Sequence, residues 1–336
     1  MNEKVANICM IGHGMMGVWH SEALQDQPCR LHTVVGRRPA PTAEFAGRYG
    51  YLNWTVDFAA ALADPAVDIV IVAGPSETHA EMARQAVAAG KHTLVEIPLA
   101  MNLAESERLV ALAAERRVVL GVVHPMRFRP ERRAVLERIR VGEERVRKTH
   151  GRFFIHRLEN VGATGYRRSW TDNILWHHTA HLVDLGLWMA CGGAMKDADA
   201  RVRTVHCAMP GPDPRTGIPM EIALTVETHD DQIIVATGSY YGRERIYDTL
   251  VVSDRDSYRL DENAGLLTTG SGTVGVASER ENAWLCARDF VAALAEDREP
   301  LVPGWSVLPT MRILHRAQEQ WDAIHGRQIL PGRPVM

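Results

Sequence analysis

Long hydrophobic runs are missing from this chain of 336 residues, and none of its apolar stretches approaches the roughly 20 residues of a membrane span. The amino terminus passes from a short polar stretch into a brief apolar run, which is not the layout of a signal peptide. The five cysteines are scattered without paired spacing, as is typical of reduced thiols. These absences predict a cytoplasmic protein that does not bind membranes.

A strong excess of charge is missing too. Lys and Arg total 38 against 41 Asp and Glu, which gives a formal net charge of −3. A balanced chain of this kind offers no extended basic surface for nucleic acid. Hydrophobic residues make up 46% of the sequence, which is ordinary for a globular protein, and the length suits two domains. We therefore expect a small molecule as the partner.

The first third of the chain alternates short apolar runs with segments of helical periodicity. The strands predicted from these runs cover residues 5–11, 31–35, 68–73, 93–95 and 118–123. The helices predicted between them cover residues 15–25, 40–49, 56–62, 77–89 and 104–116. Strands that are apolar throughout and separated by helices indicate a parallel sheet covered on both faces.

After His124 the pattern changes, because strands follow one another with few helices between them. These strands are predicted at residues 146–155, 201–207, 221–228, 232–240, 247–252 and 257–260, and helices at 173–190, 282–294 and 308–325. The fold class predicted is α/β, a doubly wound parallel sheet followed by an α+β domain with a large, open, mostly antiparallel sheet. We place the domain boundary between residues 123 and 124, with the late helices free to pack back on the first domain. An open sheet face would be apolar and need cover, so a homodimer or homotetramer is expected.

A glycine motif follows the first predicted strand and opens the first predicted helix. It reads Gly12-His13-Gly14-Met15-Met16-Gly17 and fits the pattern G-x-G-x-x-G. In this context Gly12 allows the tight turn, Gly14 lets the backbone approach a pyrophosphate, and Gly17 lets the helix pack on the strand. The positive end of the helix then faces the phosphates. The motif predicts a dinucleotide-binding domain over residues 1–123.

The end of the second predicted strand indicates which dinucleotide binds. An NAD enzyme usually carries Asp or Glu there for the ribose hydroxyls, but this chain has Gly36-Arg37-Arg38. Two guanidinium groups suit a 2′-phosphate, so the prediction is NADP rather than NAD. The alternative is that the two arginines form a solvated basic turn.

Several segments together resemble the Gfo/Idh/MocA family of NAD(P)-dependent oxidoreductases, and they span most of the chain. They are the glycine motif, Gly74-Pro75-Ser76-Glu77-Thr78-His79, Gly90-Lys91-His92 leading into Glu96-Ile97-Pro98, and His181-Leu182-Val183-Asp184. The resemblance implies a Rossmann domain followed by a domain with a large open antiparallel sheet. It also implies that residues 74–76, Thr78 and His79 flank the cofactor.

Ile97 is where this chain departs from the family pattern. The resemblance places Glu96 and Pro98 below the nicotinamide, with a lysine between them that helps to move the substrate proton. Here the residue is isoleucine. If the chain is an enzyme of this family, its acid–base group must lie elsewhere.

Three histidines within five residues, His177, His178 and His181, make the densest chemistry in the chain. At about 100° per helical residue, His177, His181 and Asp184 fall within about 60° of one another on one helix face. An imidazole titrates near neutral pH, so this face predicts acid–base catalysis. The family resemblance matches His181 to the catalytic histidine and His177 to an aspartate near the substrate. Asp184 is expected to orient a histidine or the substrate.

A metal site and a purely structural role are the alternatives to catalysis for these histidines. Histidines four residues apart on a helix can hold zinc, but no Glu or Cys has the complementary spacing and the resemblance requires no metal. In the structural alternative, the imidazoles are hydrogen-bonded parts of a buried helix.

The residues around the histidines point to the substrate. The expected contacts are His124, Arg127, Tyr166, Arg167, Arg168 and Trp176. A pocket rich in Arg and His with few acids suits an anionic, carboxylate-bearing substrate.

The stretch 167–188, together with Ile97, resembles a narrower branch of the family. Its members oxidise the cyclic hemiacetal of an aromatic ring-cleavage product with NADP. The resemblance implies hydride transfer from the hemiacetal carbon, with His181 as general base and His177 or His178 as alternates. The alternatives are a family dehydrogenase acting on a sugar, cyclitol or other hemiacetal, and an NADP(H)-binding regulator without catalysis.

Overall fold

The computed structural model describes residues 5–161, 170 and 173–326. The described chain divides into two compact units, each with its own sheet. The first unit holds residues 5–125 and 283–305, and the second holds 126–161, 170, 173–282 and 306–326. Compactness does not show which segments fold independently, so the domain boundary at residue 123 stays a prediction.

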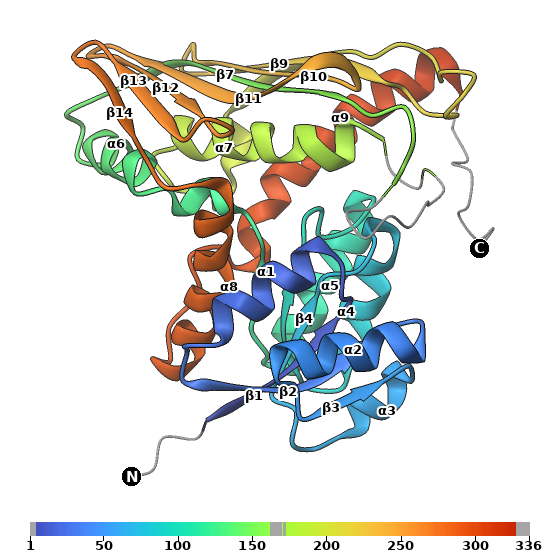
Figure 1. Ribbon diagram of the computed structural model, residues 1–336. Helices are drawn as coiled ribbons and strands as arrows, with labels where there is room; N and C mark the ends of the chain where they lie inside the picture. The colour runs from blue at the N-terminus through green and yellow to red at the C-terminus, as the bar shows by residue number, and fades with distance from the viewer. Residues whose placement is uncertain (1–4, 162–169, 171–172, 327–336) are drawn as a thin grey trace. The chain divides into compact units, whose positions relative to one another are not determined.

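The first unit is built on a six-stranded parallel sheet in the order β3-β2-β1-β4-β5-β6 (Figure 1). The strands are β1 Ala6–Ile11, β2 Cys29–Val35, β3 Asn53–Thr55, β4 Ile69–Val72, β5 His92–Val95 and β6 Leu120–Val122. The apolar runs that predicted the central strands are buried, and all four residues of β4 are fully covered. The order reverses between β1 and β4, and such switch points are where doubly wound sheets bind ligands. This sheet confirms the predicted Rossmann fold.

Helices connect these strands as expected. They are α1 Met15–Leu24, α2 Pro39–Tyr49, α3 Phe58–Ala63, α4 His79–Ala88 and α5 Leu103–Arg116, with a 3-10 turn at Ser76–Thr78. The late helix α8 Glu279–Ala295 belongs to this unit from Ala283 onward. Its Arg288 donates to the carbonyl of Ala23 near the end of α1, and Phe290 lies against Gly121 of β6. The unit also holds the start of a 3-10 turn at Gly304–Val307.

The second unit is built on an eight-stranded sheet in the order β14-β13-β12-β11-β7-β10-β9-β8. The strands are β7 Val146–His156, β8 Val202–Ala208, β9 Glu221–Thr228, β10 Ile233–Ser239, β11 Tyr241–Ser253, β12 Ser257–Asp261, β13 Leu266–Thr269 and β14 Gly272–Gly275. Only the pairing of β10 with β7 is parallel. The large, mostly antiparallel sheet is therefore confirmed. The strands β13 and β14 at one end of this sheet were not predicted, since both are short and β14 is exposed throughout.

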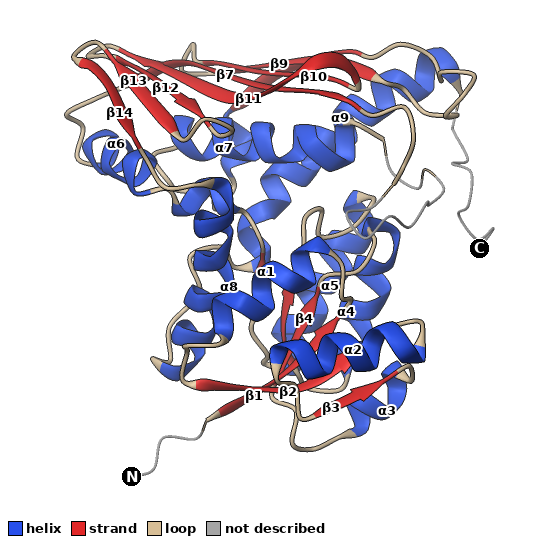
Figure 2. Ribbon diagram, viewed as in Figure 1, coloured by secondary structure: helices blue, strands red, loops and turns tan. Residues whose placement is uncertain are grey.

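Helices cover one face of this sheet (Figure 2). They are α6 Pro130–Arg140, α7 Ala180–Ala190 and α9 Leu308–His325. A 3-10 turn at Pro125–Phe128 comes before α6, and a π-helical segment at Leu175–Thr179 comes before α7. A second 3-10 turn, at Ala198–Arg201, lies between α7 and β8. Glycines let α7 approach the sheet closely. A Cβ added to Gly186 would lie 2.3 Å from Ile234 Cγ2, and one added to Gly151 would lie 2.8 Å from Leu182.

The opposite face of the sheet is more polar than expected. Side chains alternate along a strand, so Arg152, next to the helix-facing Gly151, points away from α7. Its guanidinium pairs with Asp248 on the neighbouring strand, and Asp248 also accepts a hydrogen bond from Arg259 at 2.9 Å. The expectation of an apolar open face was wrong in this part of the sheet, and the oligomeric state stays a prediction. Among the described residues, no helix combines the length and the hydrophobicity that crossing a membrane requires.

The tight contact at Gly186 yields a stability prediction. Replacing Gly186 by Ala raises helix propensity but drives a methyl group into Ile234, so we expect a net loss of about 1–2 kcal/mol in the free energy of unfolding. Gly47 in α2 has open space at its Cβ position, so Gly47→Ala should stabilise by about 0.5–1 kcal/mol. Urea unfolding followed by circular dichroism measures both. Equal effects of the two substitutions would contradict close helix–sheet packing.

Candidate active site

The glycine motif forms a tight turn at the carboxyl end of β1. Gly12 has a φ of 98°, and a Cβ there would lie 2.6 Å from the carbonyl oxygen of Ala73. A Cβ on Gly17 would lie 2.3 Å from the carbonyl oxygen of Gly12, so the first turn of α1 rests directly on the loop. At Gly14, by contrast, a Cβ would meet nothing within 4 Å. The loop therefore packs tightly against the protein at Gly12 and Gly17, while Gly14 has open space beside it.

The end of β2 lies beside this loop. The imidazole of His13 lies against Gly36, with its Cδ2 2.7 Å from where a Cβ would stand. Arg37 and Arg38 follow Gly36 and are exposed. Partial burial lowers the pKa of His13, and the positive charges of Arg38 and Arg37 lower it further. The charges of the two arginines therefore act on a side chain of the glycine motif.

His79 joins the two loops that follow β4 and β5. Its Nδ1 lies 2.8 Å from the carbonyl oxygen of Pro98, and its Nε2 lies 3.0 Å from that of Gly74. The side chain is buried at the start of α4. Within the first loop, the hydroxyl of Thr78 donates to the carbonyl of Pro75 at 2.7 Å. Residues 74–78 and 96–98, both predicted to contact a cofactor, are thus linked through one imidazole.

Glu96 is held by a residue that the sequence analysis missed. Its Oε1 lies 2.6 Å from Nε2 of His20, which is fully buried on α1. The only sequence signal for this pair is a histidine among the mostly small, uncharged residues that α1 buries. Ile97, beside Glu96, is also buried and precedes Pro98 through a cis peptide bond. An aliphatic side chain offers no proton at this position, so the first unit lacks the acid–base group expected there.

In the second unit, the histidine segment begins with a π-helical turn. The side chain of Asn173 accepts hydrogen bonds from the backbone N–H groups of Leu175 and Trp176 at 3.0 and 3.3 Å. The N–H of Thr179 donates to the carbonyl of Ile174, five residues earlier. The continuous α-helix predicted over residues 173–190 was therefore wrong in its first turns. The alignment of His177 with His181 was expected from α-helical spacing, and it stays a prediction in this segment.

His178 is enclosed by aromatic rings. Its imidazole stacks on Phe153 of β7 at 3.7 Å and on His177 at 4.0 Å, with interplanar angles of 14° and 6°. Its Nδ1 lies 3.1 Å from the hydroxyl of Tyr240. Desolvation lowers the pKa of His178 well below its usual value, and His177, Arg157, His181 and Arg245 lower it further through their charges. This ring is neutral at physiological pH, so it is a weak base.

Asp184 is engaged in a buried ion pair. The Arg127 guanidinium donates to both its carboxylate oxygens at 2.7 and 2.5 Å, and the Thr310 hydroxyl donates at 3.0 Å. Arg127 also donates to the side chain and carbonyl of Ser306. Asp184 and Arg127 are each about 1% exposed. These contacts give both residues a structural role, and the catalytic and substrate roles expected of them stay predictions.

The other residues expected to contact the substrate lie in different units or outside the described part of the chain. Trp176 is buried and its indole N–H donates to Gln318 at 2.9 Å, while His124 is buried in the first unit. Tyr166, Arg167 and Arg168 lie outside the described residues. Among the described residues, no group of three or more His, Cys, Asp or Glu side chains is arranged to hold a metal ion.

Comparison with known proteins identifies the family. The family model for oxidoreductases with an NAD-binding Rossmann fold, Gfo/Idh/MocA, matches residues 6–124, and the model for bacterial oxidoreductase carboxyl-terminal domains matches residues 130–258. This chain belongs to the Gfo/Idh/MocA family. It is an oxidoreductase of the NAD(P)-dependent dehydrogenase type, as the sequence analysis predicted.

Three individual proteins show which members of the family this chain is similar to. A 4-carboxy-2-hydroxymuconate-6-semialdehyde dehydrogenase of Sphingobium sp. (strain NBRC 103272 / SYK-6) is 30% identical over 322 residues, which cover 94% of this chain and 98% of that protein. A scyllo-inositol 2-dehydrogenase (NAD(+)) of Bacillus subtilis (strain 168) is 32% identical over 42% of each chain. The structure of a levoglucosan dehydrogenase with NADH and levoglucosan superimposes with a TM-score of 0.78 over 94% of this chain and 98% of that one, at 19% identity.

The glycine loop fits the dinucleotide that this Gfo/Idh/MocA chain is expected to bind. The backbone at Gly12 and Gly17 is packed against other protein atoms, so of the three glycines only Gly14 leaves room for a ligand to approach. Gly14 is also the N-cap residue of α1. No side chain caps this helix end, and its first turn contains no acidic residue. The backbone N–H groups at that end would hold the pyrophosphate. Residues 36–38 would hold the adenosine ribose.

A substitution at Gly14 can test whether the pyrophosphate binds there without changing the stability of the fold. Gly14 has extended backbone angles that any residue adopts, so Gly14→Val should leave the melting temperature close to that of the wild type. Its side chain would occupy the approach to the pyrophosphate, and we expect the Kd for NADPH to rise by at least about 10-fold. Fluorescence titration measures the Kd.

Gly17→Ala is the matched control for that variant. Its methyl group would meet the Gly12 carbonyl, so its melting temperature should fall. Unchanged NADPH affinity in Gly14→Val would contradict the proposed pyrophosphate site.

Proposed function

We propose that this protein oxidises the cyclic hemiacetal of 4-carboxy-2-hydroxymuconate-6-semialdehyde to 2-pyrone-4,6-dicarboxylate, a step of the protocatechuate 4,5-cleavage pathway, with NADP as cofactor. The observation that carries the proposal is the Sphingobium relative, which matches this chain over nearly its whole length and that of the relative. The named sugar and inositol dehydrogenases with similar sequences match no more than 42% of this chain. A full-length match includes the second unit, which carries the histidine segment.

Replacement of the usual lysine by Ile97 supports a substrate with an acidic hydroxyl. A hemiacetal hydroxyl loses its proton more readily than a simple alcohol, so a neutral imidazole suffices as the base. A bound nicotinamide would supply the hydride acceptor for the hemiacetal C–H bond. The O–H proton goes to an imidazole of this chain, and a lactone carbonyl remains.

We assign the base to His181. It is partly exposed at the start of α7, directly after the π-helical segment. His178 is the weaker candidate because it is sandwiched between two rings and its pKa is strongly lowered. His177 is the remaining alternate, and its partly exposed ring covers one face of His178.

NADP is the proposed cofactor because Arg37 and Arg38 follow β2 without a carboxylate for the ribose hydroxyls. Their positive charges lower the pKa of His13, and the N–H groups of a guanidinium have a geometry that suits the oxygens of a 2′-phosphate. A dehydrogenase of a sugar or cyclitol is the second candidate, and the inositol dehydrogenase relative favours it.

A panel of substrates and cofactors tests the function. The purified protein is assayed by absorbance at the reduced nicotinamide band with the ring-cleavage hemiacetal, myo-inositol and levoglucosan, each with NADP and NAD. We expect turnover of the hemiacetal, with kcat/KM at least about 10-fold higher with NADP than with NAD. The double variant Arg37→Ala/Arg38→Ala should lose that preference while keeping turnover with NAD. Turnover of the polyols alone would favour the second candidate, and equal use of both cofactors by the wild type would contradict the NADP assignment.

Removal of the base gives a further prediction. His181→Ala should lower kcat by about 10²- to 10⁴-fold, the contribution typical of a general base, with little change in NADPH affinity. His206→Ala, at an exposed histidine of β8, is the matched control and should keep wild-type turnover. Near-normal turnover of His181→Ala would move the role to His177.

A further inference from the structure

Arg157 stands directly after β7, and two contacts fix its position. Its backbone N–H donates to the carbonyl of Tyr240 at 2.9 Å. Its Nη2 donates to the side chain of Asn160, which is buried, at 2.6 Å. The arginine itself is partly exposed. One edge of the guanidinium is therefore anchored to the protein.

Two aromatic rings flank the same guanidinium. Its Cζ lies 5.1 Å from the ring centroid of Trp170 and 5.8 Å from that of Tyr240. Both rings are buried, and their centroids are 5.6 Å apart. Aromatic faces attract a cation and hold its plane without neutralising its charge. The side chain is thus oriented in advance for a further partner.

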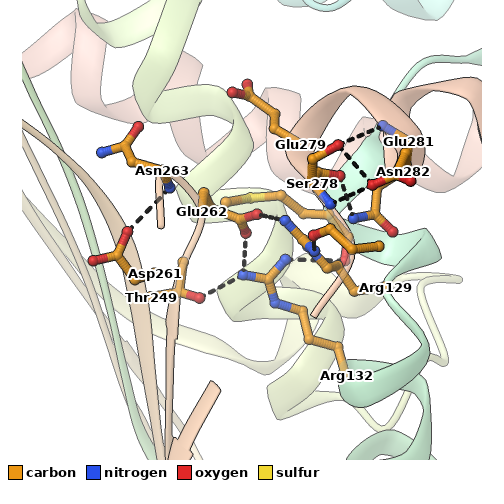
Figure 3. A network of polar contacts seen from close by, with 12 residues as sticks. Arg129, Arg132, Thr249, Asp261, Glu262, Asn263, Ser278, Glu279, Glu281 and Asn282 are labelled. Carbon is orange, nitrogen blue, oxygen red and sulfur yellow. Dashed lines mark hydrogen bonds and ion pairs between the residues drawn. The ribbon is translucent and has the colours of Figure 1, made fainter. Parts of the chain in front are cut away.

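Arg157 differs in this respect from the buried arginines of the same unit. Arg127 pairs with Asp184, while Arg129 and Arg132 both pair with Glu262 (Figure 3). Within the described part of the chain, Arg157 has no carboxylate partner, and its only side-chain hydrogen bond goes to the neutral amide of Asn160. A charge held in a partly buried place without a counter-charge favours an anion supplied from outside.

Tyr240 connects this arginine to the histidine segment. One side chain of Tyr240 meets Arg157 through its ring and His178 through its hydroxyl, 3.1 Å from Nδ1. His178 in turn stacks on His177. The positive charge of Arg157 also contributes to the lowered pKa of His178, after desolvation and His177. The charge of Arg157 and the histidines therefore belong to one cluster.

We propose that Arg157 is a specificity-determining residue that binds a carboxylate of the substrate, while the histidine segment receives the hydroxyl proton. This inference rests on the proposed function and names the group that selects a dicarboxylate over a neutral polyol. The planar guanidinium matches a carboxylate with parallel N–H···O bonds. At Arg127, by contrast, the two N–H groups that could bind a carboxylate in this way already donate to Asp184.

Kinetics with three variants test the proposal. Arg157→Gln removes the charge, Arg157→Lys keeps the charge without the planar fork, and Arg84→Gln alters an exposed arginine of α4 that pairs with Glu81. With the dicarboxylate hemiacetal, we expect kcat/KM to fall about 10- to 100-fold in Arg157→Gln, chiefly through KM, and less in Arg157→Lys. Arg84→Gln should match the wild type. A purely structural role of Arg157 would lower kcat and the melting temperature together and leave KM unchanged, which would overturn the proposal.

Binding of the product keeps this test separate from the proposed function. Calorimetric titration of 2-pyrone-4,6-dicarboxylate into the NADP-loaded protein needs no turnover. We expect Arg157→Gln to raise the Kd by the same factor as KM, and binding by the wild type to weaken at higher salt.

The two proposals fail under different results. If the wild type binds the dicarboxylate through Arg157 but oxidises none of the hemiacetal, the proposed function fails and the carboxylate site stands. If the hemiacetal is oxidised and Arg157→Gln keeps kcat/KM within about twofold, the site fails and the function stands. If Arg157→Gln does not fold, Arg157→Lys decides, and unchanged KM and Kd in that variant would overturn the proposal.

Discussion

The buried ion pair between Arg127 and Asp184 is the contact on which the second unit depends. It joins the 3-10 turn before α6 to the middle of α7, and Thr310 brings in the first turn of α9. Two charges at about 1% exposure are tolerated only because nearly every donor and acceptor is matched. Since α7 begins at Ala180, the pair also fixes the helix that carries His181.

The pairing of buried charges decides which arginines of this protein can bind a ligand. Arginines inside the second unit are neutralised by carboxylates of the chain itself, as the Arg129–Glu262–Arg132 group illustrates. Arg157 is held by rings and an amide instead, so its charge stays available. In the first unit, Ile97 replaces an ionisable group by an apolar side chain. Within the second unit, Arg157 and the histidine segment support the proposed recognition of an anion and the proposed transfer of the proton to an imidazole.

Patterns with local causes were predicted well. The apolar strands β1, β2, β4 and β5 were found within two residues of their bounds, because a parallel sheet covered on both faces needs continuous hydrophobic runs. The tight turn at Gly12 and the close packing of α1 at Gly17 also followed from the motif. Prediction failed where the backbone departs from standard periodicity. Asn173 caps a π-helical segment, and nothing in the spacing of residues 173–181 distinguishes it from an α-helix.

Features that depend on a local residue pattern were determined by the sequence itself. They are the two sheet types, the dinucleotide loop, the absence of the usual lysine and the cluster of histidines. Only the tertiary structure decided which charges are neutralised inside the protein and which remain. The sequence pointed to Arg127 as a substrate contact and not to Arg157, but Arg127 meets Asp184, 57 residues away, and Arg157 meets the rings of Trp170 and Tyr240. The reason is physical: a charge is neutralised by whichever group packing brings within a few ångströms, and that group is rarely a sequence neighbour.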